Sequence, residues 1–176
     1  MLARLSLPCL SLFAASLAAQ LPPHAVALNP TLPTLTSLQL AHSGDVVHAV
    51  GMNGTQVRYA RSSDGGRTWP VRELQLTVAD DLNALAVDGN RVVVLVHSNT
   101  LGPHVVTSTD GGNTWASPVR VSIAPHLANG FPGSRLLLNG STVLVLWREA
   151  NGFGSVWLNR STDGGETWTN MGLPES

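Results

Sequence analysis

Side chains that could bind a ligand or exchange protons occur in five short segments, at residues 51–56, 77–83, 97–104, 122–134 and 148–154. Carboxylates and imidazoles transfer protons, and guanidinium groups bind anions through paired hydrogen bonds. The residues of this kind are Asp80, Asp81, Asn83, His97, His104, His126, Asn129, Arg148 and Glu149. We treat these segments as the candidate ligand-binding loops.

The sequence does not favour a metal or cofactor site. The six His residues show no metal-ligand spacing, although His97 and His104 flank one loop. The sequence has no G-x-S-x-G elbow, no H-E-x-x-H pair and no phosphate-binding Gly-rich loop. We expect no cofactor and no metal.

One eight-residue phrase occurs three times: SSDGGRTW at 62–69, STDGGNTW at 108–115 and STDGGETW at 161–168. Gly in such a turn supplies positive φ, Asp bonds to nearby backbone amides, and Trp fills the gap between neighbouring sheets. The residues expected to brace these octets are Ser62, Asp64, Gly66, Thr68, Trp69, Ser108, Asp110, Gly112, Thr114, Trp115, Ser161, Asp163, Gly165, Thr167 and Trp168. We expect the octets to be structural turns and not catalytic centres.

The octets divide the sequence into repeats, with start-to-start spacings of 46 residues (62 to 108) and 53 residues (108 to 161). Each repeat begins with a segment that ends at a turn Gly, at 37–44, 82–89 and 134–140. A β-branched apolar run follows, at 46–50, 92–96 and 143–147. A third segment enters the octet and a fourth leaves it. Four short strands per repeat predict an all-β fold of three antiparallel propeller blades, at about 37–77, 81–123 and 133–173.

Alignment of the repeats separates packing residues from candidate ligands. His48 takes the place of Val94 and Val145, so we expect a packed strand residue. In the aligned repeats, the position at the end of the second strand is occupied by Gly51, His97 and Arg148.

Arg135 is the most suggestive charge of the sequence. It aligns with Gln39 and Ala84 on the inner strand, which lines the propeller axis, and it precedes the apolar run 136–138. Arg135 is either a solvated or ion-paired residue at a strand end, or a ligand-binding residue.

The octet pattern S-x-D-x-G-x-T-W resembles the Asp-box, or bacterial neuraminidase repeat. The resemblance covers roughly residues 37–173, with three full matches. It implies a sialidase-like β-propeller in which each Asp-box lies between the third and fourth strands, on the rim away from the active site. It also implies an exported glycoside hydrolase of the exo-α-sialidase type, or the N-terminal fragment of one, acting on a glycan. The alternative is a non-catalytic Asp-box module that binds glycan or protein.

The resemblance also implies a catalytic set that this sequence matches poorly. Members of the family hold the substrate carboxylate with three arginines, use an Asp as acid/base and a Tyr as nucleophile. Arg135, Arg148 and Asp81 are weak catalytic candidates on this basis. The candidates on the ligand face are His97, Asp80, Asn83, His126 and Glu149. Trp147 and Trp157 either stack on sugars or pack within the strands.

Tyr59 is the only Tyr, and no Arg-Ile-Pro stretch is present. Tyr59 aligns with Val105 and Leu158 in the other repeats, so we expect a packed strand residue and not a nucleophile.

Residues 1–19 have the composition of a signal peptide, with Arg4 followed by an apolar run and small residues before the cleavage position. Residues 20–36 form a Pro-rich leader, and 37–176 the partial propeller. We expect a secreted or periplasmic protein with no membrane contact after cleavage. Cys9 is the only cysteine and would be removed, and a net charge of −1 gives no surface for nucleic acid.

Three blades do not obviously close a ring, because propellers have about 4–8. The chain is the first half of a six-bladed enzyme, a whole protein that pairs with itself, or a decayed remnant. An open stack leaves two apolar sheet faces exposed, which predicts self-association through them.

Overall fold

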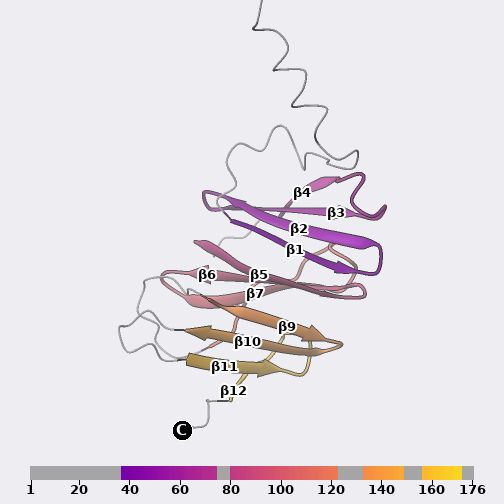
Figure 1. Cartoon of the computed structure of the whole chain (residues 1–176). Helices are drawn as coiled ribbons and strands as arrows, with labels where there is room; N and C mark the ends of the chain where they lie inside the picture. Colours follow the sequence, from indigo (N-terminus) through magenta and orange to yellow (C-terminus); the bar gives the residue numbers. More distant parts are fainter. Residues whose placement is uncertain (1–36, 75–79, 123–132, 149–155, 172–176) are drawn as a thin grey trace, which may run out of the picture.

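The computed structural model describes residues 37–74, 80–122, 133–148 and 156–171, and all regular elements in these ranges are β-strands. Three four-stranded antiparallel sheets are stacked one on another in chain order (Figure 1). The predicted all-β, three-bladed partial propeller is therefore confirmed. We call the sheets blades 1, 2 and 3.

The strands of each blade follow one another in space as they do in the sequence. Blade 1 consists of β1 (Ser37–Ser43), β2 (Val46–Asn53), β3 (Gln56–Ser62) and β4 (Val71–Leu74). Blade 2 consists of β5 (Asp81–Asp88), β6 (Arg91–Ser98), β7 (Gly102–Ser108) and β8 (Val119–Arg120). Blade 3 consists of β9 (Arg135–Asn139), β10 (Thr142–Arg148), β11 (Val156–Ser161) and β12 (Thr169–Asn170). Each octet joins the third strand to the fourth.

The strand pairing corrects part of the repeat alignment. The residues opposite the first Ser of the three octets are Val47, Val92 and Val143. His48 therefore takes the place of Val93 and Leu144, and the predicted equivalence with Val94 and Val145 is wrong by one residue. A shift of one residue moves a side chain to the other face of its sheet.

The same correction applies at the end of the second strand, where Met52 and not Gly51 is equivalent to His97 and Arg148. The inner-strand alignment is confirmed. Gln39, Ala84 and Arg135 pair with Val50, Leu95 and Leu146, which occupy one repeat position.

Two apolar clusters hold the blades together. The first lies between blades 1 and 2 and contains Val50, Met52, Val57, Tyr59, Leu82, Val92, Val94, Val96 and Val106. The second lies between blades 2 and 3 and contains Val93, Leu95, Val105, Val121, Val143, Val145 and Trp147. Successive β6 residues alternate between the clusters, so β6 is buried on both faces, as its unbroken apolar run predicts.

The outer faces of the stack carry exposed apolar side chains. On blade 1, Leu38 is 47% exposed and Leu40 is 59% exposed. On blade 3, Leu137 is 66% exposed and Val156 is 40% exposed.

Candidate functional site

The octets are closed hydrogen-bonded turns. In the second octet, the Ser108 hydroxyl donates to Asp110 Oδ1 at 2.8 Å and accepts from the Gly112 amide at 2.8 Å. Asp110 also accepts from the Asn113 and Thr114 amides at 2.9 Å and from Thr114 Oγ1 at 2.6 Å. The first and third octets repeat this pattern around Asp64 and Asp163.

These bonds favour the charged carboxylate. The hydroxyl of Thr114, then its amide, and then Ser108 lower the pKa of Asp110 well below its ordinary value. The pKa values of Asp64 and Asp163 are lowered by the equivalent bonds. A carboxylate held ionised by its own turn is unsuited to proton transfer near neutral pH.

The octets identify the two ends of the stack. The first Gly of each octet donates its amide to the turn between the first and second strands of its own blade, as Gly111 does to Asn90 at 2.7 Å. We call this the octet end. The turns between second and third strands lie at the opposite end, which we call the loop end.

The structure brings several predicted residues together at the loop end of blade 2. Asp81 begins β5 opposite His97 in β6, and Asp80 donates its amide to the His97 carbonyl at 2.7 Å. The Asp80 carboxylate accepts from the Asn99 amide at 2.7 Å. Asn83 lies at a β-bulge and donates to Asp81 at 3.4 Å.

These contacts give Asp80, Asp81 and Asn83 a structural role at the loop end, in addition to any role in ligand binding. Asp81 also accepts from the Leu82 amide at 2.9 Å and from Ser37 of blade 1 at 3.4 Å. His97 is buried inside β6 and not in an exposed loop. His104 is buried in β7, its Nδ1 lies 2.9 Å from the Gly102 carbonyl, and burial lowers its pKa.

The two candidate arginines lie on blade 3. Arg148 ends β10 at the loop end and is exposed. Arg135 begins β9, is exposed, and donates to the Ser134 carbonyl at 3.0 Å. By strand alternation both side chains belong to the outer face of blade 3, together with Leu137. His126, Asn129 and Glu149 lie outside the described residues.

Tyr59 is buried between blades 1 and 2, with 1% of its surface exposed. Its hydroxyl lies 2.7 Å from His48 Nδ1 and donates to the Gly111 carbonyl at 3.0 Å. His48 is buried as predicted, and its Nδ1–H donates to the Tyr59 oxygen in the tautomer that satisfies both bonds. Tyr59 thus has a packing role, as the repeat alignment predicts.

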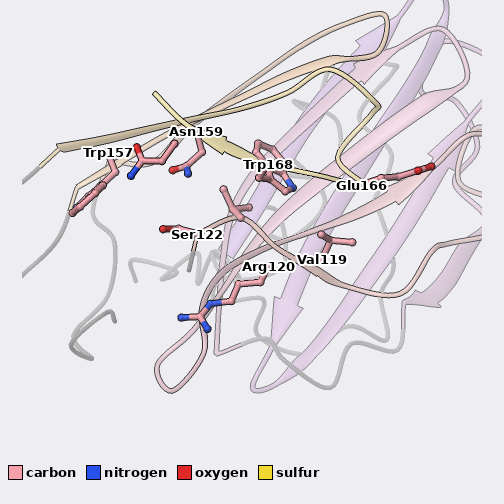
Figure 2. A pocket seen from close by; sticks show the side chains of 9 residues that line it. Val119, Arg120, Ser122, Trp157, Asn159, Glu166 and Trp168 are labelled. Atoms are coloured by element: carbon pink, nitrogen blue, oxygen red, sulfur yellow. The ribbon is translucent and has the colours of Figure 1, made fainter. Parts of the chain in front are cut away.

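A cavity of about 620 Å³ opens between blades 2 and 3 (Figure 2). Blade 3 contributes Trp157 and Asn159 from β11 and Glu166 and Trp168 from the third octet. On the opposite wall, in and after β8, lie Val119, Arg120, Val121 and Ser122. Asn170 completes the lining.

Two side chains of the cavity wall, Trp157 and Asn159, contact Trp147. Trp157 stacks on Trp147, with ring centroids 5.8 Å apart and an interplanar angle of 14°. Asn159, 1% exposed, accepts from the Trp147 indole at 3.1 Å, which leaves its amide nitrogen to donate. Within the described chain, the buried indole nitrogen of Trp157 has no hydrogen-bond partner.

This arrangement suits a polyhydroxylated ligand. Indole rings offer flat apolar surfaces with a polar edge, and fixed amide donors bond to hydroxyl oxygens. The repeat alignment did not identify the cavity, because its walls come from different repeats. The available signal was Asn159, a polar residue in a buried strand where blade 2 has Val106.

In the part of the chain that the structure describes, no group of three or more His, Cys, Asp and Glu residues could hold a metal ion. The same ranges contain no helix long and apolar enough to cross a membrane.

Comparison with known proteins identifies the fold without a family. No family model matches the chain, and no curated protein matches it. Among solved structures, it is similar to the GH93 α-L-arabinofuranosidase of Fusarium graminearum, with 16% identity, a TM-score of 0.53, and coverage of 75% of this chain and 46% of that one.

Two further structures show the same similarity. YCF48 from Cyanidioschyzon merolae is 21% identical, with a TM-score of 0.52 and coverage of 82% of this chain and 39% of that one. The NanB sialidase of Streptococcus pneumoniae is 18% identical, with a TM-score of 0.52 and coverage of 76% and 23%. The chain spans less than half the length of each of these proteins. These similarities show that the chain has the fold of part of a β-propeller.

Proposed function

We propose that this chain forms part of an exported carbohydrate-active β-propeller of the sialidase-like, exo-α-sialidase type, and that its octets are Asp-boxes. The observation that carries the proposal is the combination of three octet-braced blades with a fold similar to an arabinofuranosidase and a sialidase. Fold alone does not define activity. The proposal therefore includes both the substrate and the catalytic residues.

The described residues supply part of a glycosidase site. Asp81, at the loop end of blade 2, would be the acid, and Arg148, at the loop end of blade 3, would be an anion-binding group on the outer face of that blade. Tyr59 is enclosed at a blade interface and cannot attack a sugar. Because Tyr59 is the only Tyr of this sequence, a Tyr nucleophile of the sialidase type would have to come from outside it.

The test is hydrolysis of fluorogenic α-sialoside and α-L-arabinofuranoside, together with calorimetric binding of the matching oligosaccharides. We expect binding by the chain alone, weak or no turnover, and loss of any turnover in Asp81→Asn. Thr109→Ala, an exposed octet position with no hydrogen bond in the described residues, is the control. A chain that neither binds nor cleaves any of these sugars would refute the proposal.

A non-catalytic glycan-binding module is the second candidate, and the cavity between blades 2 and 3 favours it. Trp157→Phe replaces the indole of the cavity wall by a smaller aromatic ring, so oligosaccharide affinity should fall several-fold if sugars bind there. Trp69→Phe is the matched control, because Trp69 does not line this cavity. Equal affinities in the two variants would exclude the cavity as the glycan site.

A further inference from the structure

The two buried blade interfaces share one docking contact, in which the octet of a blade rests on the third strand of the preceding blade. At the first interface, Tyr59 donates to the Gly111 carbonyl, and a Cβ on Gly112 would overlap the phenol. At the second, a Cβ on Gly165 would lie 3.1 Å from the Thr107 side chain and 3.4 Å from that of Val105. The second Gly of the octet allows this close approach at both interfaces.

A second contact links the inner turns at the octet end. The Gly89 amide donates to Ser43 Oγ of blade 1 at 3.1 Å. The Gly140 amide donates to Asp88 Oδ2 of blade 2 at 2.6 Å. Ser43 and Asp88 occupy one repeat position, so each interface uses a side-chain acceptor and the turn amide of the following blade.

Blade 3 carries an unused copy of the acceptor half of this interface. Leu158 takes the position of Tyr59, and Asn139 takes the position of Asp88. Asn139 is exposed, and within the described residues its side chain makes no hydrogen bond. Leu137 beside it is 66% exposed, whereas its equivalent in blade 2, Ala86, is only partly exposed.

Blade 1 carries an unused copy of the other half. Gly65 of the first octet is exposed and Gly66 is partly exposed, whereas both glycines of the second and third octets are buried. Leu40, on the same outer face, is 59% exposed. Gly44 takes the position of Gly89 in the inner turn.

The two unused halves carry opposite charges. At the first interface, the side chains of Arg61 and Asn90 lie 3.6 and 3.8 Å from the Cβ position of Gly111. The corresponding positions of the unused halves hold Arg160 on blade 3 and Asp45 on blade 1. Docking by the same contact would bring this cation and this anion together.

We propose that blade 3 of one copy of this chain packs on blade 1 of a second copy, and that two copies close a six-bladed ring through two identical interfaces. Within the described residues, one half of each kind has no partner blade, so a head-to-tail pair leaves neither exposed. It also spans 46% of the Fusarium arabinofuranosidase, so that two copies supply about one such fold.

The test is the mass of the purified chain by sedimentation equilibrium, over a hundredfold range of concentration. We expect twice the mass of one chain, which is 18.5 kDa with residues 1–19 included, and no larger species. Leu137→Glu on blade 3 and Leu40→Glu on blade 1 should each raise the dissociation constant by at least a hundredfold. Leu101→Glu, at a 45% exposed Leu in the β6–β7 turn, should leave the pair intact.

Because the substituted side chains are largely exposed, the variants should fold, and far-UV circular dichroism checks this. A monomeric chain would overturn the proposal. So would a pair that Leu40→Glu leaves intact, which would indicate contact between like faces. A mass that grows with concentration beyond that of two copies would overturn the closed ring and indicate an open filament.

Discussion

Gly112 is the residue whose replacement separates backbone strain from blade docking. It has a φ of +86°, and a Cβ there would overlap the Tyr59 phenol. Gly66 has a φ of +89°, but its nearest neighbour beyond the adjacent residues is Trp69, at 3.6 Å from the Cβ position.

For the single chain, we expect Gly112→Ala to lower the free energy of unfolding by about 2–4 kcal/mol and Gly66→Ala by about 1–2 kcal/mol, because within one chain only the first adds overpacking to strain. Urea unfolding monitored by tryptophan fluorescence measures both. Equal losses of unfolding free energy in the two variants would show that the Tyr59 side chain moves aside without an energetic penalty.

His48 makes stability depend on pH. Burial, followed by the nearby Arg61 charge, lowers its pKa from 6.5 to about 4. Between these values the unfolded chain binds a proton that the folded chain does not. The free energy of unfolding should therefore fall as the pH drops from 6.5 to 4, by about 3 kcal/mol from this residue.

His48→Gln keeps a donor for Tyr59 without a titrating group, so its stability should change less over this pH window. Urea unfolding at pH 7, 6 and 5 makes the comparison, with His42→Gln at an exposed position as control. An unchanged slope in His48→Gln would assign the pH dependence to other groups, such as His104.

The octet is the element that joins the third and fourth strands, and its Asp holds the turn closed. We expect Asp110→Ala to lower the melting temperature clearly, because Thr114, Asn113 and Ser108 lose their shared acceptor. Thr109→Ala in the same octet should have little effect.

The Asp residues of the octets should also make the stability of the fold sensitive to acid, at pH values below the range in which His48 acts. The pKa values of these Asp residues are lowered in the folded chain. Their contribution to the free energy of unfolding is therefore present above pH 3.8 and is lost as the pH falls below it. Differential scanning calorimetry from pH 5 to pH 2 measures this loss. Asp110→Ala should show a smaller loss in that range than Thr109→Ala.

The elements show how far the sequence alone could lead. The octets and the apolar runs predicted twelve strands in three sheets, because turn chemistry and alternation are local properties. The predicted alignment of β2 with the other second strands was wrong by one residue. An unbroken apolar run, such as that of β6, has no alternation of polar and apolar residues, so it does not show which side chains lie on which face of the sheet. The Tyr59–Gly111 contact and the cavity could not be predicted, since each depends on residues from different blades.

For the single chain, outside the proposed pair, the middle blade should be the most stable part. β6 is buried on both faces and takes part in both apolar clusters. Amide hydrogen exchange should therefore be slowest in β6, faster in β10 and fastest in the two-residue strands β8 and β12. Exchange in β6 as fast as in β10 would contradict the prediction that blade 2 is the most stable part.

The inner-turn contacts have a consequence for the ancestry of such chains. Each blade offers one side-chain acceptor to its successor and one amide to its predecessor. A tandem duplication of a single repeat would therefore add a blade whose joints on both sides already fit.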